Sequence, residues 1–329
     1  MLATAGFRLL EVNERSQALE ISKMEIQETL KSHFGSTFSG KVLTRVITGQ
    51  QEAELAWIAA RVGSLEANRS NRKRIGILEI GGASVQVVIP TEPDKVGRDN
   101  EDNQDLYIQS YLGYGAHEVE SALNSRAIAL QANRKDTIES PCGFEGNQEL
   151  VETKTIKYTG DFDSCVHKIT DLLQLDKRQM QKKGIDESMG DLINPIPKIL
   201  LHDTQFYGLA LFYHVSHFIH VSIRALPHFP KITLSTISES GRKLCSQPWN
   251  EMVKRYSDVD ENTPPKRLPG RCFDAALLAA LMTGLGIVDN DVYVEAVQKI
   301  GKINIDWTVG VAIHLLSGNN FYREDTIFG

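Results

Sequence analysis

Stretches of β-branched and apolar residues alternate with polar stretches along the whole chain. Two short apolar runs, Ile75–Ile80 and Val85–Ile89, flank the pair Gly81–Gly82. They predict a β-hairpin, because glycine accepts the positive φ that a tight turn needs. Apolar residues at near-helical spacing predict a helix over Ile21–Phe34.

A capping signal marks the start of another helix. Thr48 is followed three residues later by Gln51, which has the form of a capping box and predicts an amphipathic helix. Glu52 then lies in the first turn of that helix, where the helix dipole favours an ionised carboxylate. The first interpretation of Glu52 is therefore structural: its carboxylate stabilises the start of the helix.

The remaining elements follow from the same patterns and from proline and glycine breaks. A strand is expected to turn into a helix at Ala3–Gly6, and residues 133–200 are expected to be polar and irregular. The other expected elements are strands Val42–Ile47, Tyr107–Tyr114 and Lys302–Ile305, a helix ending at Leu130, two buried helices at Phe206–Leu226 and Cys272–Leu285, and a helix Trp307–Leu316 with Asp306 as its N-cap.

Length and composition limit the class of protein. The 329 residues are 41% hydrophobic, which is enough for a substantial core and for two domains. The net charge of −6 argues against nucleic-acid binding through a broad basic face, but a small polyanion still fits a local pocket. The sequence has no run of about eighteen apolar residues, so it does not predict a membrane span. At the N-terminus, Arg8 and Glu11 interrupt the hydrophobic region that a signal peptide needs.

The four cysteines form two pairs at similar separations, Cys142 with Cys165 and Cys245 with Cys272. Two sequential disulfides would fit an oxidising compartment, and four buried thiols in a cytosolic protein would fit the same spacing. The cysteines do not have zinc-ligand spacing. The glycosylation sequon Asn68-Arg69-Ser70 is a weak signal that agrees with the oxidising compartment.

Three polar side chains stand at the tip of the predicted hairpin: Glu79 before the glycines, and Ser84 and Gln86 after them. Ser84 and Gln86 are two residues apart and therefore share one face of a strand. A glycine turn also brings backbone N–H groups close to an anion such as phosphate. An ordinary hairpin with a surface serine and glutamine explains the same residues when they are considered alone.

Four motifs occur in an order that is more specific than any one of them. They are ATAGFRLL (3–10), ITGQQEAELAW (47–57), ILEIGGASVQ (77–86) and IDWTVG (305–310), with further similarity in YLGYGAHEVESAL, SPCGFEG, FYGLALFYHVSHFI and GRCFDAALLAALMTGLG. In this order they resemble the apyrases, the nucleoside triphosphate diphosphohydrolase family. The resemblance spans nearly the whole chain.

The resemblance implies an α/β fold of two actin-like (RNase H-like) domains that close over the phosphate tail of a nucleotide. Residues 1–47 and 311–329 would form the first domain, incomplete at its N-terminus, and residues 48–310 the second. The implied reaction is hydrolysis of nucleoside tri- or diphosphates through in-line attack of water on the terminal phosphorus, assisted by Ca²⁺ or Mg²⁺. Such catalysis depends mainly on positioning and charge neutralisation.

The resemblance also implies catalytic roles. Glu52 matches the general base, and Ser84 and Gln86 match the residues that orient the attacking water. For Arg8 we expect a structural salt bridge. The backbone N–H groups expected to bind phosphate oxygens belong to Thr4, Ala5, Gly81, Gly82 and Ala83.

Base and metal sites are implied in the same way. Tyr213 or His214 lies where the family places an aromatic ring for base stacking, and a packed core aromatic is an equal alternative. Glu79, Asp306 and Trp307 lie where the family holds a metal ion through its water shell, although core packing explains Trp307 as well. The family has Asp at the position of Glu79. The added methylene shifts the carboxylate, so we expect reduced rather than abolished metal binding.

A second departure concerns the phosphate-binding loop. The family carries a glycine-rich loop of the D-x-G-S-[ST]-x-T-R type upstream of ATAG, and this chain starts at Met1, two residues before that motif. We expect a truncated gene model, a splice form or a degraded paralogue, with an unpaired sheet edge in the first domain. The second domain is expected to be intact.

Three functions are compatible with these observations: an apyrase-type hydrolase weakened by truncation, a non-catalytic nucleotide-binding remnant, and an exopolyphosphatase-like phosphohydrolase. The exopolyphosphatase-like function is considered because the motifs G-x-x-E-A and GG-x-S also occur in exopolyphosphatase-type enzymes. The expected partner is a nucleoside di- or triphosphate and not a nucleic acid, with a membrane anchor only in a longer form. The expected location is the lumen of the secretory pathway or the outside of the cell.

Overall fold

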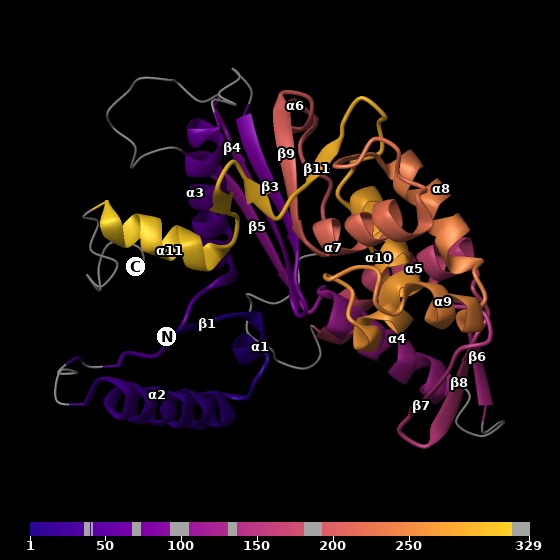
Figure 1. Cartoon of the computed structure of the whole chain (residues 1–329), viewed down its shortest axis with the longest axis horizontal. Coiled ribbons are helices and arrows are strands. Elements are labelled where there is room, and N and C mark those ends of the chain that lie inside the picture. The colour runs from indigo at the N-terminus through magenta and orange to yellow at the C-terminus, as the bar shows by residue number, and fades with distance from the viewer. Residues whose placement is uncertain are drawn as a thin grey trace.

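The computed structural model describes residues 1–35, 40, 42–67, 74–92, 105–130, 137–180 and 193–317. Its centre is a six-stranded mixed sheet with the strand order β10-β11-β9-β3-β4-β5 (Figure 1). Strands β3, β9 and β11 are parallel, and β4, β5 and β10 run antiparallel to their neighbours. The strands are β3 (Arg74–Ile80), β4 (Ser84–Pro90), β5 (Leu106–Leu112), β9 (Thr204–Ala210), β10 (Lys231–Ile232) and β11 (Val294–Ala296).

Helices cover both faces of this sheet (Figure 1). On one face, α3 (Gly49–Glu66) and α11 (Trp307–Leu316) pack on strand residues such as Ile77 and Val88. The two helices touch through their backbones, because a Cβ on Gly310 would lie 1.9 Å from the carbonyl oxygen of Leu55. The core of the other face includes residues of α4 (Ala116–Leu130), α5 (Phe162–Met180), α7 (Leu211–Phe218), α8 (Leu234–Cys245), α9 (Trp249–Tyr256) and α10 (Arg271–Gly284).

The predicted hairpin at residues 75–89 is confirmed. Strands β3 and β4 pair antiparallel with Glu79 opposite Gln86, and the N–H of Gly81 donates to the carbonyl oxygen of Ser84 at 2.9 Å. The predicted strand before Gly113 and the helix ending at Leu130 are confirmed as β5 and α4. The predicted helices Cys272–Leu285 and Trp307–Leu316 correspond to α10 and α11.

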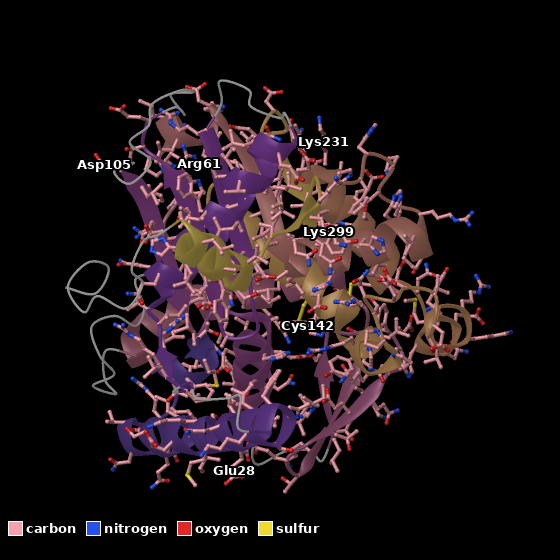
Figure 2. The ribbon with its side chains drawn as sticks, turned by 60° about the vertical axis from the view of Figure 1, so that its left-hand side comes forward. Glu28, Arg61, Asp105, Cys142, Lys231 and Lys299 are labelled. Carbon is pink, nitrogen blue, oxygen red and sulfur yellow. A yellow bond between two sulfur atoms is a disulfide. The ribbon has the colours of Figure 1, made fainter. Side chains whose placement is uncertain are left out.

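The N-terminal residues form a small unit beside the main body (Figure 1). Strand β1 (Leu2–Ala3) pairs parallel with β2 (Arg45–Val46), and α1 (Ala5–Arg8) follows β1 directly. Helix α2 (Val12–Phe34) begins nine residues before its predicted start and buries none of its side chains. Figure 2 shows its side chains, including Glu28, spread along the edge of the molecule.

The predicted domain boundaries stay a prediction. The boundary between residues 310 and 311 falls inside the continuous helix α11, which packs on α3. Residues 318–329, assigned to the first domain, lie outside the described residues. The expected strand Val42–Ile47 is shorter than predicted, with only the two residues of β2 in the sheet. Similarly, Lys302–Ile305 is reduced to β13 (Ile303–Asn304), which pairs with β12 (Lys299–Ile300).

Two predictions were wrong. Phe206–Leu226 is not one helix: strand β9 ends at Ala210, and α7 and a π-helix (Ile219–Ile223) follow. A parallel strand buried on both faces has a continuous apolar sequence, which resembles that of a buried helix. The region 133–200 is not irregular, because it contains helix α5, α6 (Lys198–Leu201) and a sheet of β6 (Thr137–Ser140), β7 (Gln148–Val151) and β8 (Lys154–Tyr158).

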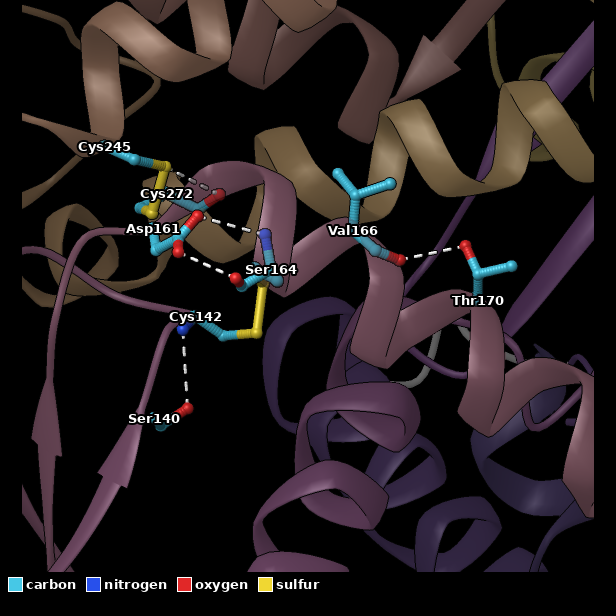
Figure 3. The surroundings of a disulfide bond; sticks show 9 residues. Ser140, Cys142, Asp161, Ser164, Val166, Thr170, Cys245 and Cys272 are labelled. Atoms are coloured by element: carbon cyan, nitrogen blue, oxygen red, sulfur yellow. Dashed lines mark hydrogen bonds between the residues drawn. A yellow bond between two sulfur atoms is a disulfide. The ribbon is translucent and has the colours of Figure 1, made fainter.

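Both cysteine pairs are disulfides, as the first of the two alternatives predicted. Cys142 bonds to Cys165 with an S–S distance of 2.12 Å, and Cys245 bonds to Cys272 at 2.13 Å (Figure 3). They tie the loop after β6 to α5, and the end of α8 to the start of α10. The sequon at residues 68–70 lies outside the described residues. Among the described helices, none is long and apolar enough to cross a membrane.

The hairpin turn is joined to α4 by its backbone. The N–H groups of Ala116 and His117, at the start of α4, donate to the carbonyl oxygens of Gly81 and Gly82 at 2.9 and 2.8 Å. The loop before α4 touches the turn so closely that a Cβ on Gly115 would lie 2.3 Å from the nitrogen of Ala83. Only glycine fits at this position, because the nearest atoms belong to the backbone of Gly82 and Ala83, which cannot move aside as the end of a flexible side chain can.

Substitution Gly115→Ala should therefore destabilise the protein. Overpacked positions cost about 1–3 kcal/mol of unfolding free energy, and we expect a loss of that size in urea unfolding followed by circular dichroism. The control is Gly270→Ala, because no atom lies within 4 Å of the Cβ that it would add. Equal stability of the two variants would contradict the close contact between the loop and the turn.

Candidate active site

Helix α3 brings Glu52 to the end of the sheet. The predicted capping box is confirmed: Thr48 Oγ1 accepts from the N–H of Gln51 at 3.2 Å, and Gln51 Oε1 accepts from the N–H of Thr48 at 2.9 Å. This pair fixes the first helical residue as Gly49. Glu52 lies one turn from the cap and keeps only 7% of its surface exposed.

The carboxylate of Glu52 faces the N-terminal unit. Arg8 Nη2 lies 3.1 Å from Glu52 Oε2, while Arg8 Nη1 donates to the carbonyl oxygen of Ile47 at 2.8 Å. The salt bridge expected for Arg8 is therefore present. Burial raises the pKa of Glu52, and the charge of Arg8 together with hydrogen bonds from Arg8 and Thr4 opposes that rise. A buried carboxylate that loses these partners would hold its proton more tightly.

A row of polar side chains lies on the α3 face of the sheet. Glu79, Gln86 and Ser110 are neighbours on β3, β4 and β5, and Ser84 precedes Gln86 by two residues on the same face. Ser84 and Gln86 are buried, and Gln86 Nε2 donates to Ser84 Oγ at 2.5 Å. Helix α3 starts directly above this row, since a Cβ on Gly49 would lie 1.9 Å from Ser110 Oγ.

Three carboxylates from three elements interact at this end of the sheet. Burial, together with the negative charges of Glu52 and Asp306, raises the pKa of Glu79 to about 8. Within the described part of the chain, Glu79 Oε2 is a buried atom without a hydrogen-bond partner. The structure thus brings Glu52, Glu79, Ser84 and Gln86 to one place, although Glu52 has no direct hydrogen bond to Ser84 or Gln86 among the described residues.

Asp306 is the predicted N-cap of α11. Its Oδ1 accepts from the backbone N–H groups of Thr308 and Val309 at 2.7 and 3.1 Å. Trp307 is partly buried and packs against the apolar clusters beneath α3. The site predicted for Asp306 and Trp307 therefore coincides with a helix start and a packed ring.

The glycine turn offers two backbone donors. The N–H of Gly81 is occupied by Ser84, whereas the N–H groups of Gly82 and Ala83 have no protein acceptor among the described residues. Thr4, from the opposite unit, lies within hydrogen-bond reach of Glu52. Ala5 is buried at the start of α1.

A cavity of about 620 Å³ opens beside the glycine turn. This is within the range of ligand pockets, about 300–1,000 Å³. Helices α4, α7 and α10, the 3₁₀ helix η3 (Pro265–Gly270) and the sheet of β6, β7 and β8 contribute to its walls. Its lining residues include Gly81, Gly82, His117, Glu120, His214 and Arg267.

Of the two aromatic residues proposed for the base, His214 lines this cavity and Tyr213 does not. The ring of Tyr213 stacks on His217, with ring centroids 5.2 Å apart. Burial and the charge of Arg271 lower the pKa of His214, so its imidazole is neutral near pH 7. A neutral half-buried ring is suited to stacking.

Sequence analysis missed the charged residues of the cavity. Ala116, His117 and Glu120 line it from one face of α4, at spacings of one and four residues. Arg267 and Asp274 come from η3 and α10, far away in the sequence. The spacing on α4, directly after Gly113 and Gly115, was the one local signal of these residues.

A model of the GDA1/CD39 (nucleoside phosphatase) family matches residues 1–327. The chain is similar to probable apyrase 3 of Arabidopsis thaliana, with 26% identity across 95% of this chain and 65% of the relative. It is also similar to the Golgi apyrase of Schizosaccharomyces pombe, with 22% identity across 94% of this chain and 58% of that protein. The chain thus spans 58% to 65% of the length of these relatives.

Among solved structures, the fold is similar to that of nucleoside triphosphate hydrolases from Neospora caninum. The TM-score is 0.61 at 15% identity, covering 97% of this chain and 72% of that one. At this identity the likeness concerns the fold alone. It confirms the predicted α/β class with actin-like architecture.

Replacing Glu79 by Gln should change how stability depends on pH. A carboxyl group whose pKa is raised to about 8 in the folded state stabilises the fold only while it is protonated. That contribution is complete below the ordinary pKa of about 4.3 and is lost as the pH rises towards 8. We therefore expect Glu79→Gln to melt at the same temperature as the parent near pH 4 and several degrees higher near pH 8.

The measurement is thermal unfolding across this pH range with EDTA present. Glu139→Gln, at an exposed position of β6, is the matched control and should follow the parent at every pH. Parallel melting curves for the parent and Glu79→Gln would contradict a protonated Glu79.

Proposed function

The chain belongs to the GDA1/CD39 (nucleoside phosphatase) family, which confirms the apyrase resemblance, and from this premise we propose that it hydrolyses nucleoside tri- and diphosphates. Water attacks the terminal phosphorus and releases phosphate. One observation carries the proposal: Glu52, Glu79 and the bonded pair Ser84–Gln86 gather beside a glycine turn and a ligand-sized cavity.

Glu52 is the proposed general base. A carboxylate beside the attacking water accepts its proton, and a pKa raised by burial makes it a stronger base than an exposed glutamate. Arg8 keeps this carboxylate ionised and fixes its orientation through the 3.1 Å ion pair. The Ser84–Gln86 pair, held on one strand face, orients the water by donating and accepting hydrogen bonds.

The phosphate tail is proposed to lie at the glycine turn. The N–H groups of Gly82 and Ala83 have no other acceptor among the described residues and donate to phosphate oxygens. The nucleoside then occupies the adjacent cavity, with its base against the ring of His214. A nucleotide fits this cavity better than polyphosphate does, because only a nucleotide has a base to place against the ring of His214.

A divalent cation, Ca²⁺ or Mg²⁺, is part of the proposal. Carboxylate oxygens are ligands for both ions, and the unpartnered Oε2 of Glu79 beside Asp306 fits such a cation. Within the described residues no group of three or more His, Cys, Asp or Glu side chains could hold a metal directly. We therefore assign Glu79 and Asp306, with Trp307 alongside, to a hydrated ion. When bound, the cation neutralises phosphate charge.

The proposed location is the secretory pathway or the cell exterior. Two disulfides in one chain are typical of an oxidising compartment. A relative at 22% identity is a Golgi apyrase, which agrees with this compartment.

Glu52→Gln should remove most of the phosphate release. Loss of a general base costs about 10²–10⁴ in kcat, and we expect a fall of that size for ATP, GDP and UDP with Ca²⁺ or Mg²⁺ present. EDTA should abolish the parent activity, and either cation should restore it. Glu66→Gln, at the exposed end of the same helix, should keep the parent rate. An unchanged rate for Glu52→Gln would exclude Glu52 as the base.

Arg8→Met should move the acid limb of the pH profile. Glu52 works as a base only when ionised, so activity is lost as the pH falls through its pKa. Arg8 opposes the rise of that pKa, and its removal raises the pKa further. The acid limb of kcat/KM should therefore shift to higher pH in Arg8→Met and return towards the parent position in Arg8→Lys. An acid limb that does not move would show that Arg8 has no electrostatic effect on the base.

A further inference from the structure

One wall of the cavity leads away from the glycine turn along α4. His117 touches the turn, because a Cβ on Gly82 would lie 2.9 Å from His117 Nδ1. Glu120 lines the same cavity and lies three residues further along the helix, nearly one turn, or about 5 Å. A ligand whose phosphates lie at Gly82 therefore extends its nucleoside part past His117 towards Glu120.

Three carboxyl groups line this cavity, and two of them already have partners. Glu149 Oε2 accepts from the hydroxyl of Tyr158 at 2.8 Å, and Asp274 Oδ2 lies 2.8 Å from Arg271 Nη1. Glu120 has no hydrogen-bond or ion-pair partner among the described residues. It is therefore the carboxyl group that remains available to a ligand.

The shape of a carboxylate selects a particular base edge. Its two oxygens accept two parallel N–H bonds. Guanine presents such a pair, the ring N1–H beside the exocyclic amino group. Uracil presents a single N–H between two carbonyl oxygens that a carboxylate repels, and adenine presents an amino group beside an acceptor nitrogen.

We infer that Glu120 determines base specificity by accepting the N1–H and amino donors of guanine, so that guanine nucleotides are the preferred substrates. The inference rests on the proposed function and adds to it the residue that selects the base. The groups that act electrostatically on Glu120 are the carboxylates of Asp274 on α10 and Glu149 on β7, the hydroxyl of Tyr158 on β8 and the guanidinium of Arg267 on η3.

The preference should depend on pH. Burial, with the charges of Asp274 and Glu149, raises the pKa of Glu120 to about 7 against the opposing charge of Arg267. Below this pKa the protonated carboxyl group offers one donor and one acceptor, which is the pattern that complements adenine. Selectivity for guanine over adenine should therefore rise from about pH 6 to about pH 8.

The first experiment compares kcat/KM for GDP, IDP, ADP and UDP. A good bidentate contact discriminates by about 1–3 kcal/mol, or roughly 5- to 150-fold, and we expect GDP to exceed UDP by such a factor. IDP, which lacks the amino group, should fall below GDP in the unmodified protein. Glu120→Gln should bring GDP and ADP close to equality, because an amide offers one donor and one acceptor. The neutral isostere should also fold, which thermal unfolding checks.

Glu118→Gln is the matched control, since Glu118 lies on the same helix outside the cavity lining. It should keep the parent order of substrates. If Glu120→Gln keeps the GDP preference as well, or if the unmodified protein hydrolyses GDP, IDP and UDP equally well, the inference is overturned while the proposed function stands.

Calorimetry with nucleosides separates the two proposals if no hydrolysis occurs. Guanosine should bind more tightly than uridine, and Glu120→Gln should reduce this difference. That result without phosphate release would support the inference and contradict the proposed hydrolysis. Equal binding of guanosine and uridine, or no binding of either, would overturn the inference. The inference would also be overturned if Glu120→Gln weakened the binding of guanosine but not that of 2′,3′-dideoxyguanosine, because Glu120 would then bind the ribose.

Discussion

The close contact between the hairpin turn and the loop before α4 determines the layout of the whole site. With no room for a Cβ on Gly115, the two backbones lie against each other, and the carbonyl oxygens of Gly81 and Gly82 serve the first N–H groups of α4. This contact leaves the N–H groups of Gly82 and Ala83 as the donors of the turn that have no protein acceptor among the described residues. It also places the start of α4 beside the glycine turn, where both line the cavity.

The two faces of the sheet divide the proposed chemistry between them. Strand alternation places Glu79, Ser84 and Gln86 under α3 and leaves Ile80 and Val85 facing α7 and α10. Groups that would act on the terminal phosphate therefore lie on one side of the turn, and groups that would contact the nucleoside lie on the other. Residues that select the base would therefore be separate from the residues around Glu52.

Local signals in the sequence predicted the parts of the site that depend on neighbouring residues. The capping box at Thr48, the N-cap at Asp306 and the glycine hairpin are each defined by contacts within a few residues, and each is present. Family motifs then added the grouping of Glu52 with Ser84, which periodicity alone does not give.

The remainder depends on contacts between distant segments. Strand β9 looks helical in sequence because it is buried between two neighbours in the middle of the sheet. The cavity takes Glu120, His214 and Arg267 from segments up to 147 residues apart, so no window of sequence contains it. His214 and Tyr213 both lie on α7, and only His214 lines the cavity. The sequence did not distinguish them, because the boundaries of this helix were predicted wrongly.

The electrostatics of the site explain why a cation belongs to the proposal on physical grounds. Burial, together with repulsion from Glu52 and Asp306, raises the pKa of Glu79 to about 8, and a polyphosphate tail would add further negative charge. Arg8 already forms an ion pair with Glu52 and a hydrogen bond to the carbonyl oxygen of Ile47. Its charge is therefore balanced by Glu52 and is not free to neutralise the substrate. A divalent ion bound with the phosphates would resolve this conflict, because its charge would balance that of the carboxylates and of the phosphates. On this argument the carboxylates would suit a metal–nucleotide complex rather than the free nucleotide.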